Sequence, residues 1–326
     1  MIIDGAFFTI GLILLCYGAD FLVKGASRLA RDLGWSPVII GLTIVAFGTS
    51  TPELVISLIS SLKAKSMIAV GNVVGSNICN IALVLGLALI IRPMKSHPSI
   101  RRREFPIMLG VSFYLLAICF NDVISRIEGV SLLVGICLYT FLNYRIAVKG
   151  AEVNALAIIS LDGMPAPAFM ASRTGQIVCI VGGIAGVLVG AELLIDAAVS
   201  MMSALGVGEK FIGLTVVALG TSLPELATSA VAAYRGEMDI SIGNLLGSNV
   251  FNILSVLGLA ATVSPIPIPG GFVGSGLMVD VLVMVGISAL PWVMMGKNDI
   301  LTRGNGCVLL ACYATYLGFL VFRGAV

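Results

Sequence analysis

The sequence has few charged residues and a single histidine. Charged residues make up 11% of the 326, whereas about 25% is usual in soluble domains. Hydrophobic residues make up 58%, and the mean hydropathy is +1.08. This composition indicates an integral membrane protein that contacts the lipid bilayer, and no soluble domain remains once the apolar runs are removed. The net charge of +2 points to no particular partner; we expect no nucleic-acid partner, and protein partners stay unknown.

The scarcity of histidine and the cysteine pattern argue against catalysis. The seven cysteines lie within apolar runs without a CxxC pair, so core thiols are expected rather than disulfides or a metal cage. His97, the one histidine, is expected in a solvated loop. Intramembrane proteases and transferases need a nucleophile with its base, a metal cage or a basic phosphate site. We therefore expect a protein that is not an enzyme and has no resident cofactor.

Apolar runs of about 20 residues recur along the whole chain, and each can cross roughly 30 Å of hydrocarbon as a helix. The runs are continuously apolar and rich in glycine, which favours helices over the alternating strands of a β-barrel. The sequence therefore predicts an all-α membrane protein with ten transmembrane helices. The expected spans are 6–27, 36–62, 66–91, 105–121, 127–148, 174–204, 208–234, 238–263, 272–296 and 304–322.

Lysine and arginine collect on one side of these spans. If the first loop is cytoplasmic, fourteen basic residues lie inside and five outside, in agreement with the positive-inside rule. Both termini then face outward, and the linker 149–173 is cytoplasmic. The protein is expected in the plasma (inner) membrane. The N-terminal apolar run has no basic n-region and no cleavage site, so it is expected to stay as a helix.

The two halves of the chain repeat one another. A shift of 172 positions aligns IIGLTIVAFGTSTPEL at 39 with FIGLTVVALGTSLPEL at 211, and GNVVGSNICNIALVLGLA at 71 with GNLLGSNVFNILSVLGLA at 243. Five spans separate equivalent positions, so the halves enter the membrane in opposite directions. We expect a first five-helix repeat over 1–148 and a second over 174–326, with the repeated motifs within about 39–88 and 211–260. Inverted repeats are typical of secondary transporters with a midplane site, although aquaporin-type channels also have them.

The repeated motif places a carboxylate in the middle of an apolar helix. Ser50, Glu53 and Ser57 share one helical face, at the depth where a charge costs most. Pro52 prevents the helical hydrogen bond to the carbonyl of Gly48 and predicts free backbone oxygens from Ala46 to Thr49. Such a break is tolerated in lipid only where it lines a cavity or is buried in protein. A bound cation satisfies that condition.

Three further helices repeat this polar pattern with neutral oxygen donors. The second stripe is Asn72, Ser76 and Asn80, its equivalent is Asn244, Ser248 and Asn252, and the second acidic stripe is Ser222, Glu225 and Ser229. None of the four stripes contains lysine or arginine, which disfavours an anion. Oxygen ligands alone select hard cations, and two glutamates balance one Ca²⁺. Bare paired carboxylates are costly to move through a closed state, which favours an antiporter over a leak.

At these residues the sequence resembles the calcium/cation antiporter superfamily, in particular its sodium/calcium exchanger-like members, which carry G-T-S-x-P-E and G-N-x-x-G-S-N in two repeats. The resemblance implies four cation sites between helices two, three, seven and eight, with helices one and six sliding across them. It implies Glu53 and Glu225 as Ca²⁺ ligands. The other implied ligands are the side chains of Ser50, Ser76, Ser222 and Ser248 and the carbonyls of Ala46, Thr49, Ala218 and Thr221.

The remaining motif residues are expected to contribute at or around this site. Asn80 and Asn252 are neutral where family members vary between Asn and Asp, so the coupling ion stays open between Na⁺, H⁺ and K⁺. The supporting residues are Asn72, Asn244, Pro52, Pro224, Gly48 and Gly220. The alternatives to Na⁺/Ca²⁺ exchange are H⁺/Ca²⁺ or K⁺-dependent exchange and, less favoured, a cation channel.

Acidic residues outside the motifs have plainer interpretations. A lone intramembrane glutamate is often only a packing residue, but the paired repeat favours function for the two motif glutamates. Asp20 lies four residues before Lys24, which predicts an ion pair rather than a ligand. Glu192 and Asp196 have no basic neighbour at that spacing and are expected to face a water-filled vestibule.

Overall fold

The computed structural model describes residues 2–63, 65–95, 97–154, 168–205, 220–296 and 299–325. It is almost entirely helical, as the sequence predicts. The helices form two compact units, Met1–Pro52 with Cys137–Gly247, and Glu53–Ile136 with Ser248–Val326. Each unit therefore contains segments from both sequence repeats.

The helices and short strands distribute over these units as follows. The first unit contains α1 (Ile2–Leu33), α2 (Pro37–Ile40), the π-helical η1 (Gly41–Val45), α3 (Ala46–Thr49), η5 (Ala168–Ala171), α9 (Arg173–Ala204) and α12 (Leu223–Arg235). The second contains α5 (Ser66–Cys79), η2 (Asn80–Leu85), α6 (Gly86–Ile91), β1 (Met94–Lys95), η3 (Ile100–Glu104), α7 (Phe105–Cys119), β2 (Val123–Ile124), η7 (Asn252–Leu257), α14 (Gly258–Val263), β3 (Ile266–Pro267), α15 (Leu277–Met294), β4 (Ile300–Leu301) and α16 (Arg303–Ala325). Residues of α4 (Thr51–Leu62), α8 (Arg126–Asn154) and α13 (Met238–Phe251) fall in both units.

Most of the expected membrane spans correspond to helices. Within the described ranges, seven helices and one pair broken at Ser50 are long and apolar enough to cross a membrane. The span expected at 105–121 contains α7, which has 15 residues. The span expected at 208–234 runs into residues 206–219, which lie outside the described part. The count of ten helices therefore stays a prediction.

Local sequence signals set several helix ends. Ser125 and Glu128 form a capping box at the start of α8, in which the carboxylate of Glu128 accepts from the backbone N–H of Ser125 at 2.7 Å. Ser172 caps α9 by accepting from the N–H of Gly175 at 3.0 Å. Gly236 ends α12 with φ 84°, a left-handed conformation that glycine adopts without strain.

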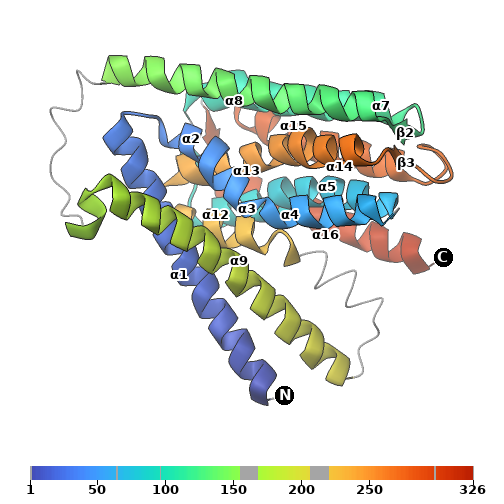
Figure 1. The fold of residues 1–326 in the computed structure, drawn as a ribbon, viewed down its shortest axis with the longest axis horizontal. Coiled ribbons are helices and arrows are strands. Elements are labelled where there is room, and N and C mark those ends of the chain that lie inside the picture. The colour runs from blue at the N-terminus through green and yellow to red at the C-terminus, as the bar shows by residue number, and fades with distance from the viewer. Residues whose placement is uncertain are drawn as a thin grey trace. The chain divides into compact units, whose positions relative to one another are not determined.

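Helices α1 and α9 of the first unit run side by side along much of their length, with backbone against backbone (Figure 1). A Cβ built on Gly18 lies 2.6 Å from the backbone N of Val187, and one built on Gly183 lies 2.6 Å from the backbone N of Leu22. Small residues at such contacts are typical of helix pairs in membranes, where close packing replaces the hydrophobic effect. These glycines therefore set the spacing of the pair.

The second unit has two small antiparallel pairings in its connecting segments. β1 pairs with β4 through Met94↔Leu301, and β2 pairs with β3 through Ile124↔Ile266. Asp122 precedes β2 with φ 59°, and its carboxylate accepts from the backbone N–H of Phe272 at 2.6 Å. Because each strand has only two residues, the all-α class is unchanged.

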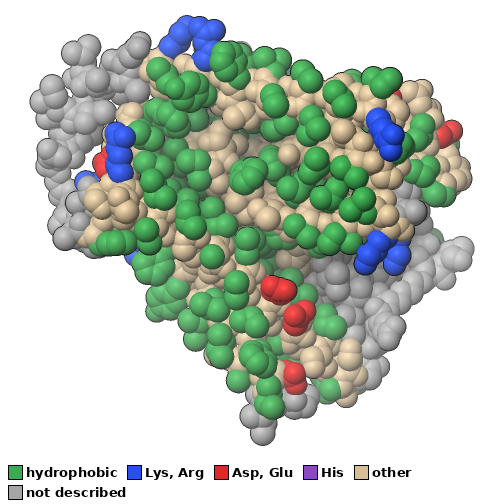
Figure 2. Space-filling model, viewed as in Figure 1, with side chains coloured by type: hydrophobic (Ala, Val, Ile, Leu, Met, Phe, Trp, Pro, Cys, Tyr) green, Lys and Arg blue, Asp and Glu red, His purple; other side chains and the backbone are tan. Residues whose placement is uncertain are grey.

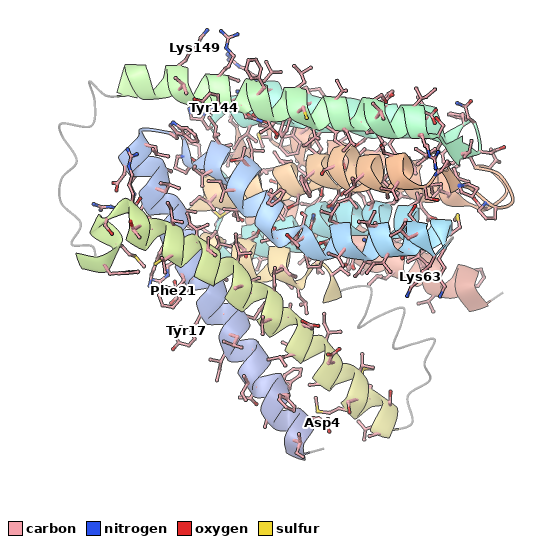
Figure 3. The ribbon with its side chains drawn as sticks, viewed as in Figure 1. Asp4, Tyr17, Phe21, Lys63, Tyr144 and Lys149 are labelled. Carbon is pink, nitrogen blue, oxygen red and sulfur yellow. The ribbon has the colours of Figure 1, made fainter. Side chains whose placement is uncertain are left out.

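The exposed surface is largely apolar. Figure 2 shows hydrophobic side chains over most of the face in view, with only scattered charged groups. Tyr17 and Phe21 point outward from α1 with 63% and 46% of their surface exposed, whereas Lys63 and Lys149 lie toward helix ends (Figure 3). This distribution suits helices that face hydrocarbon, with basic side chains at its edges.

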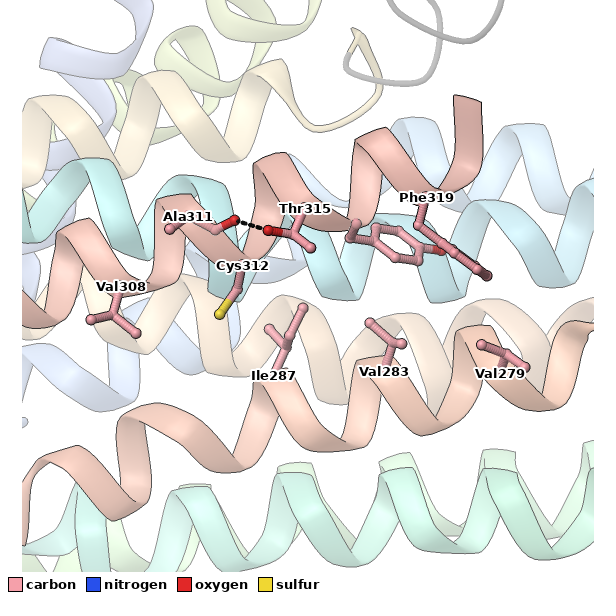
Figure 4. A pocket seen from close by; sticks show the side chains of 9 residues that line it. Val279, Val283, Ile287, Val308, Ala311, Cys312, Thr315 and Phe319 are labelled. Atoms are coloured by element: carbon pink, nitrogen blue, oxygen red, sulfur yellow. Dashed lines mark hydrogen bonds between the residues drawn. The ribbon is translucent and has the colours of Figure 1, made fainter. Parts of the chain in front are cut away.

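An apolar groove of about 580 Å³ lies between α15 and α16 of the second unit (Figure 4). Its lining includes Val283, Ile287 and Phe319, and the hydroxyl of Thr315 donates within its own helix to the carbonyl of Ala311 at 2.8 Å. No carboxylate lines this groove. It therefore lacks the chemistry of a cation site.

Candidate cation site

Each motif glutamate lies in a helix that begins directly after a serine with irregular backbone angles. α3 ends at Thr49, Ser50 has φ −83° and ψ 10°, and α4 begins at Thr51. The equivalent residue Ser222 has φ −92° and ψ 4° directly before α12. Pro52 and Pro224 lie in the first turns of the helices that follow, where proline needs no N–H partner. The break predicted from Pro52 is confirmed.

The glycines before these breaks lie against α9. A Cβ on Gly48 would lie 2.5 Å from Cδ1 of Ile184, and a Cβ on Gly220 would lie 2.6 Å from Cδ1 of Ile195. Both approaches fall within the first unit. The two glycines therefore let the chain pass close to α9 at equivalent points of the repeats, consistent with the supporting role expected for them.

The two motif glutamates are fully buried at helix starts. Glu53 lies in the first turn of α4 and Glu225 in the first turn of α12, and both are 0% exposed. The positive end of a helix dipole favours a carboxylate at this position. A fully buried carboxylate nevertheless needs compensating charge or hydrogen bonds. Both carboxylates therefore lie inside the protein rather than at its exposed surface.

In the first unit, side-chain oxygens of both repeats meet. The hydroxyl of Ser50 donates to Oε1 of Glu225 at 2.9 Å, and the hydroxyl of Thr49 donates to Oδ1 of Asn244 at 3.1 Å. Nδ2 of Asn244 donates to the hydroxyl of Ser229 at 3.1 Å. All five side chains are at most 1% exposed. This half of the site thus combines a carboxylate, hydroxyls and an amide from two sequence repeats.

The carbonyl of Ala46 is less free than the sequence suggests. It accepts from the N–H of Ser50 at 3.0 Å, and the hydroxyl of Thr49 lies 3.4 Å away. The expectation of a vacant carbonyl at Ala46 is therefore wrong. The hydroxyl has one hydrogen and lies closer to Asn244, so the carbonyl keeps one lone pair for a cation. Ala218, its equivalent, lies outside the described residues.

In the second unit, the backbone of Glu53 is held by Asn72. Nδ2 of Asn72 donates to the carbonyl of Glu53 at 3.2 Å and to the hydroxyl of Ser57 at 3.0 Å. The contact between Asn72 and Ser57 repeats the contact between Asn244 and Ser229, 172 positions later. The two asparagines therefore hold a serine of the acidic helix in the same way in both repeats.

A symmetric network of four asparagines lies in the second unit. Nδ2 of Asn80 donates to Oδ1 of Asn249 at 3.1 Å, and Nδ2 of Asn252 donates to Oδ1 of Asn77 at 3.1 Å. Nδ2 of Asn77 and Nδ2 of Asn249 each donate to the backbone carbonyl of the other residue at 3.2 Å. All four side chains are at most 1% exposed. The network connects the two G-S-N motifs.

The π-helical segments η2 and η7 begin at Asn80 and Asn252. A π turn inserts one extra residue into a helix and often marks a functional position. The amide oxygens of both residues are buried and accept no hydrogen bond within the described part of the chain. They are therefore available as ligands.

The other predicted ligands are also buried. Ser76 is 4% exposed, Ser222 is 1% exposed and Ser248 is 0% exposed, while Thr221 is partly buried. Across the described ranges, no three His, Cys, Asp or Glu side chains group closely enough to hold a metal ion. A cation at these residues therefore needs the hydroxyl, amide and backbone oxygens as well as the glutamates.

The ion pair predicted between Asp20 and Lys24 is present at 2.7 Å. Arg235 at the end of α12 also contacts Asp20, at 2.5 Å. Asp20 is thus neutralised by two basic groups, as expected for a structural rather than a ligand role.

The sequence reading did not single out Asn77 and Asn249. Their recurrence as the asparagine of both G-S-N motifs is the feature of the sequence that could have indicated a role for them. Helical spacing placed them off the predicted polar stripes, so they were missed as partners of Asn80 and Asn252.

Known proteins are similar to this chain in sequence and in fold. The family model for the sodium/calcium exchanger protein matches residues 4–145 and 175–322. The inner membrane protein YrbG of Escherichia coli (strain K12) is 36% identical over 333 residues and spans 100% of this chain and 99% of its own length. The sodium/calcium exchanger MaX1 of Methanosarcina acetivorans is 31% identical over 343 residues, covering 96% of this chain and 97% of its own. The solved structure of the sodium-calcium exchanger NCX_Mj soaked with Na⁺ and Ca²⁺ matches with a TM-score of 0.82 and 34% identity over 98% of each chain.

The fold and the motifs define a multi-pass integral membrane protein of the ion-exchanger class. The chain belongs to the sodium/calcium exchanger family. Members of that family are ion exchangers rather than enzymes.

Proposed function

We propose that this protein is a secondary antiporter that exchanges Ca²⁺ for Na⁺ by alternating access, with Glu53 and Glu225 as the principal ligands of a midplane site. The observation that carries the proposal is the buried contact between the hydroxyl of Ser50 and the carboxylate of Glu225. Glu53 follows Ser50 by three residues, so chain geometry keeps their Cα atoms within about 11 Å.

Charge balance supports a divalent cation exchanging with monovalent ones. Two carboxylates neutralise one Ca²⁺, and more than one Na⁺ is needed for the same balance. The neutral oxygens of Ser222, Asn80 and Asn252, which accept no hydrogen bond from the described residues, offer positions for additional Na⁺. A proton needs only the carboxylates, so these neutral donors favour Na⁺ over H⁺.

The proposed location is the plasma (inner) membrane, with both termini outside and the linker 149–173 cytoplasmic. The support is the excess of basic residues on one side and the match to an inner membrane protein over its whole length. Cysteine labelling of single sites in the linker, from either side of sealed vesicles, tests this orientation.

Proteoliposomes containing the purified chain test the proposed exchange. We expect ⁴⁵Ca²⁺ uptake when Na⁺ is loaded inside and absent outside, and little uptake with an outward H⁺ or K⁺ gradient alone. Uptake driven equally by H⁺ would favour the H⁺/Ca²⁺ alternative. Current carried by Ca²⁺ without any counter-ion would favour a channel.

The serine hydroxyls are expected to act mainly on Na⁺. Ser50→Ala and Ser248→Ala should raise the Na⁺ concentration for half-maximal exchange about tenfold while changing the Ca²⁺ requirement less than threefold. The reason is that Ca²⁺ keeps both carboxylates, whereas a Na⁺ ion held by neutral oxygens loses one of its few ligands.

Ser112→Ala is the matched control for these variants. Ser112 is also buried, but its hydroxyl donates within α7 to the carbonyl of Met108 at 2.8 Å. We expect it to leave both ion dependences unchanged. Equal effects of Ser50→Ala on Na⁺ and Ca²⁺ would contradict the assignment.

A further inference from the structure

The direction of every hydrogen bond in the four-asparagine network follows from two backbone groups that can accept but cannot donate. The backbone carbonyls of Asn77 and Asn249 only accept hydrogen bonds. Each lies 3.2 Å from the side-chain nitrogen of the other residue, so that both side chains must present their NH₂ groups to these carbonyls. An amide flip at either residue would place two oxygens together. The side-chain oxygens of Asn77 and Asn249 therefore face the remaining two members of the network.

This orientation determines how Asn80 and Asn252 are turned. Each lies 3.1 Å from an amide oxygen, of Asn249 and Asn77 respectively, and must present its NH₂ group there. The oxygens of Asn80 and Asn252 then point away from the network. They are fully buried and accept no hydrogen bond from the part of the chain that the structure describes. A buried acceptor without a donor is unfavourable, and a cation removes that cost.

The same contacts disfavour a carboxylate at positions 80 and 252. An ionised aspartate has no hydrogen to donate, so one of its oxygens would face the amide oxygen of Asn249 or Asn77. Reversing the neighbouring amide does not help, because its own oxygen would then face a backbone carbonyl. The network therefore favours asparagine, the residue present at positions 80 and 252, over ionised aspartate.

We infer that Asn77 and Asn249 are positioning residues, which turn the oxygens of Asn80 and Asn252 out of the network, where a cation can bind them, and keep positions 80 and 252 uncharged. The inference rests on the proposed function for the identity of the cation. The side-chain oxygens of Asn77 and Asn249 each accept a hydrogen bond within the network, whereas those of Asn80 and Asn252 accept none from the described residues. Nδ2 of Asn249 also lies 3.7 Å from Sδ of Met108.

Asn249→Ala tests the positioning role, because it removes both the acceptor for Asn80 and the donor to Asn77. We expect the Ca²⁺ concentration for half-maximal thermal stabilisation of the detergent-solubilised chain, and that for half-maximal ⁴⁵Ca²⁺ uptake, to rise about tenfold. Asn143→Ala, at a buried asparagine of α8 outside the network, is the matched control. It should lower the unfolding temperature without changing either Ca²⁺ midpoint. Unchanged Ca²⁺ midpoints in a folded Asn249→Ala protein would overturn the inference.

A double-mutant cycle tests the exclusion of a carboxylate. Asn80→Asp alone should fail to tighten Ca²⁺ binding, although it adds a charged ligand. In the Asn249→Ala background the same change should tighten binding about tenfold, because the opposing amide oxygen is gone. Tighter binding by Asn80→Asp alone would overturn the inference even if Asn249→Ala does not fold. Asn249→Ser replaces Asn249→Ala in the cycle if the alanine variant is unstable.

The two readouts separate this inference from the proposed function. A wild-type chain that is stabilised by CaCl₂ but shows no Na⁺-driven uptake would refute the exchange activity, and the Ca²⁺ midpoints of the variants would still decide the positioning role. A wild-type chain that CaCl₂ does not stabilise at all would overturn both.

Discussion

Glu225→Gln is expected to abolish Na⁺-driven ⁴⁵Ca²⁺ uptake, with a loss of at least a hundredfold. Glutamine has nearly the same volume, and its oxygen can still accept from the hydroxyl of Ser50, so the fold should survive. What is lost is one of two negative charges. A unit charge about 4 Å from another contributes about 4 kcal/mol at an effective dielectric constant of 20, and the effect doubles for a divalent ion. Losing even half of this doubled energy, about 4 kcal/mol, lowers the Ca²⁺ affinity by more than a hundredfold.

Glu53→Gln should have a similar effect, because Glu53 occupies the equivalent position of the other repeat and is equally buried. Uptake in proteoliposomes at several Ca²⁺ concentrations measures both variants. Glu104→Gln is the matched control, since Glu104 is 1% exposed but paired with Arg103 outside the motifs. It should lower stability and leave exchange intact. Uptake at the wild-type level in Glu53→Gln or Glu225→Gln would contradict the assignment of that glutamate as a ligand.

Much of the candidate site could be predicted because its signals are local. Pro52 lies four residues after Gly48 and prevents the helical hydrogen bond to its carbonyl, which predicts a break, and the break lies at Ser50. A glutamate in the middle of an apolar helix indicates a functional polar site, and its recurrence in the second repeat argues against chance. The pair of Asp20 and Lys24 follows from helical spacing alone. In each case one helix contains the whole signal.

The parts that the sequence did not predict depend on other helices. Whether the oxygen or the nitrogen of Asn80 points out of the asparagine network depends on the amide of Asn249, which lies 169 positions away. The π turns at Asn80 and Asn252 depend on one inserted residue, which a periodicity of 3.6 does not detect. The hydrogen bond of the Thr49 hydroxyl to Asn244 likewise depends on a residue 195 positions away. Side-chain orientation at a site is therefore a tertiary property.

The close contact of α1 and α9 predicts opposite effects for two adjacent glycines on α9. Gly183→Ala places a methyl group 2.6 Å from the backbone N of Leu22 and 2.8 Å from the carbonyl oxygen of Gly18. Backbone atoms cannot rotate away as a side chain can, so the helices must separate. Overpacking of this kind typically costs 1–3 kcal/mol, and we expect a loss of about 3 kcal/mol because both obstacles are backbone.

Gly182→Ala is the matched control, because no described atom lies within 4 Å of a Cβ built there. The change should leave stability unchanged or raise it by up to about 1 kcal/mol through the higher helix propensity of alanine. Thermal unfolding of the two purified variants in the same detergent measures the difference. Equal unfolding temperatures would contradict direct backbone packing of α1 against α9. A lower temperature for Gly183→Ala alone would support close backbone packing of the two helices at this contact.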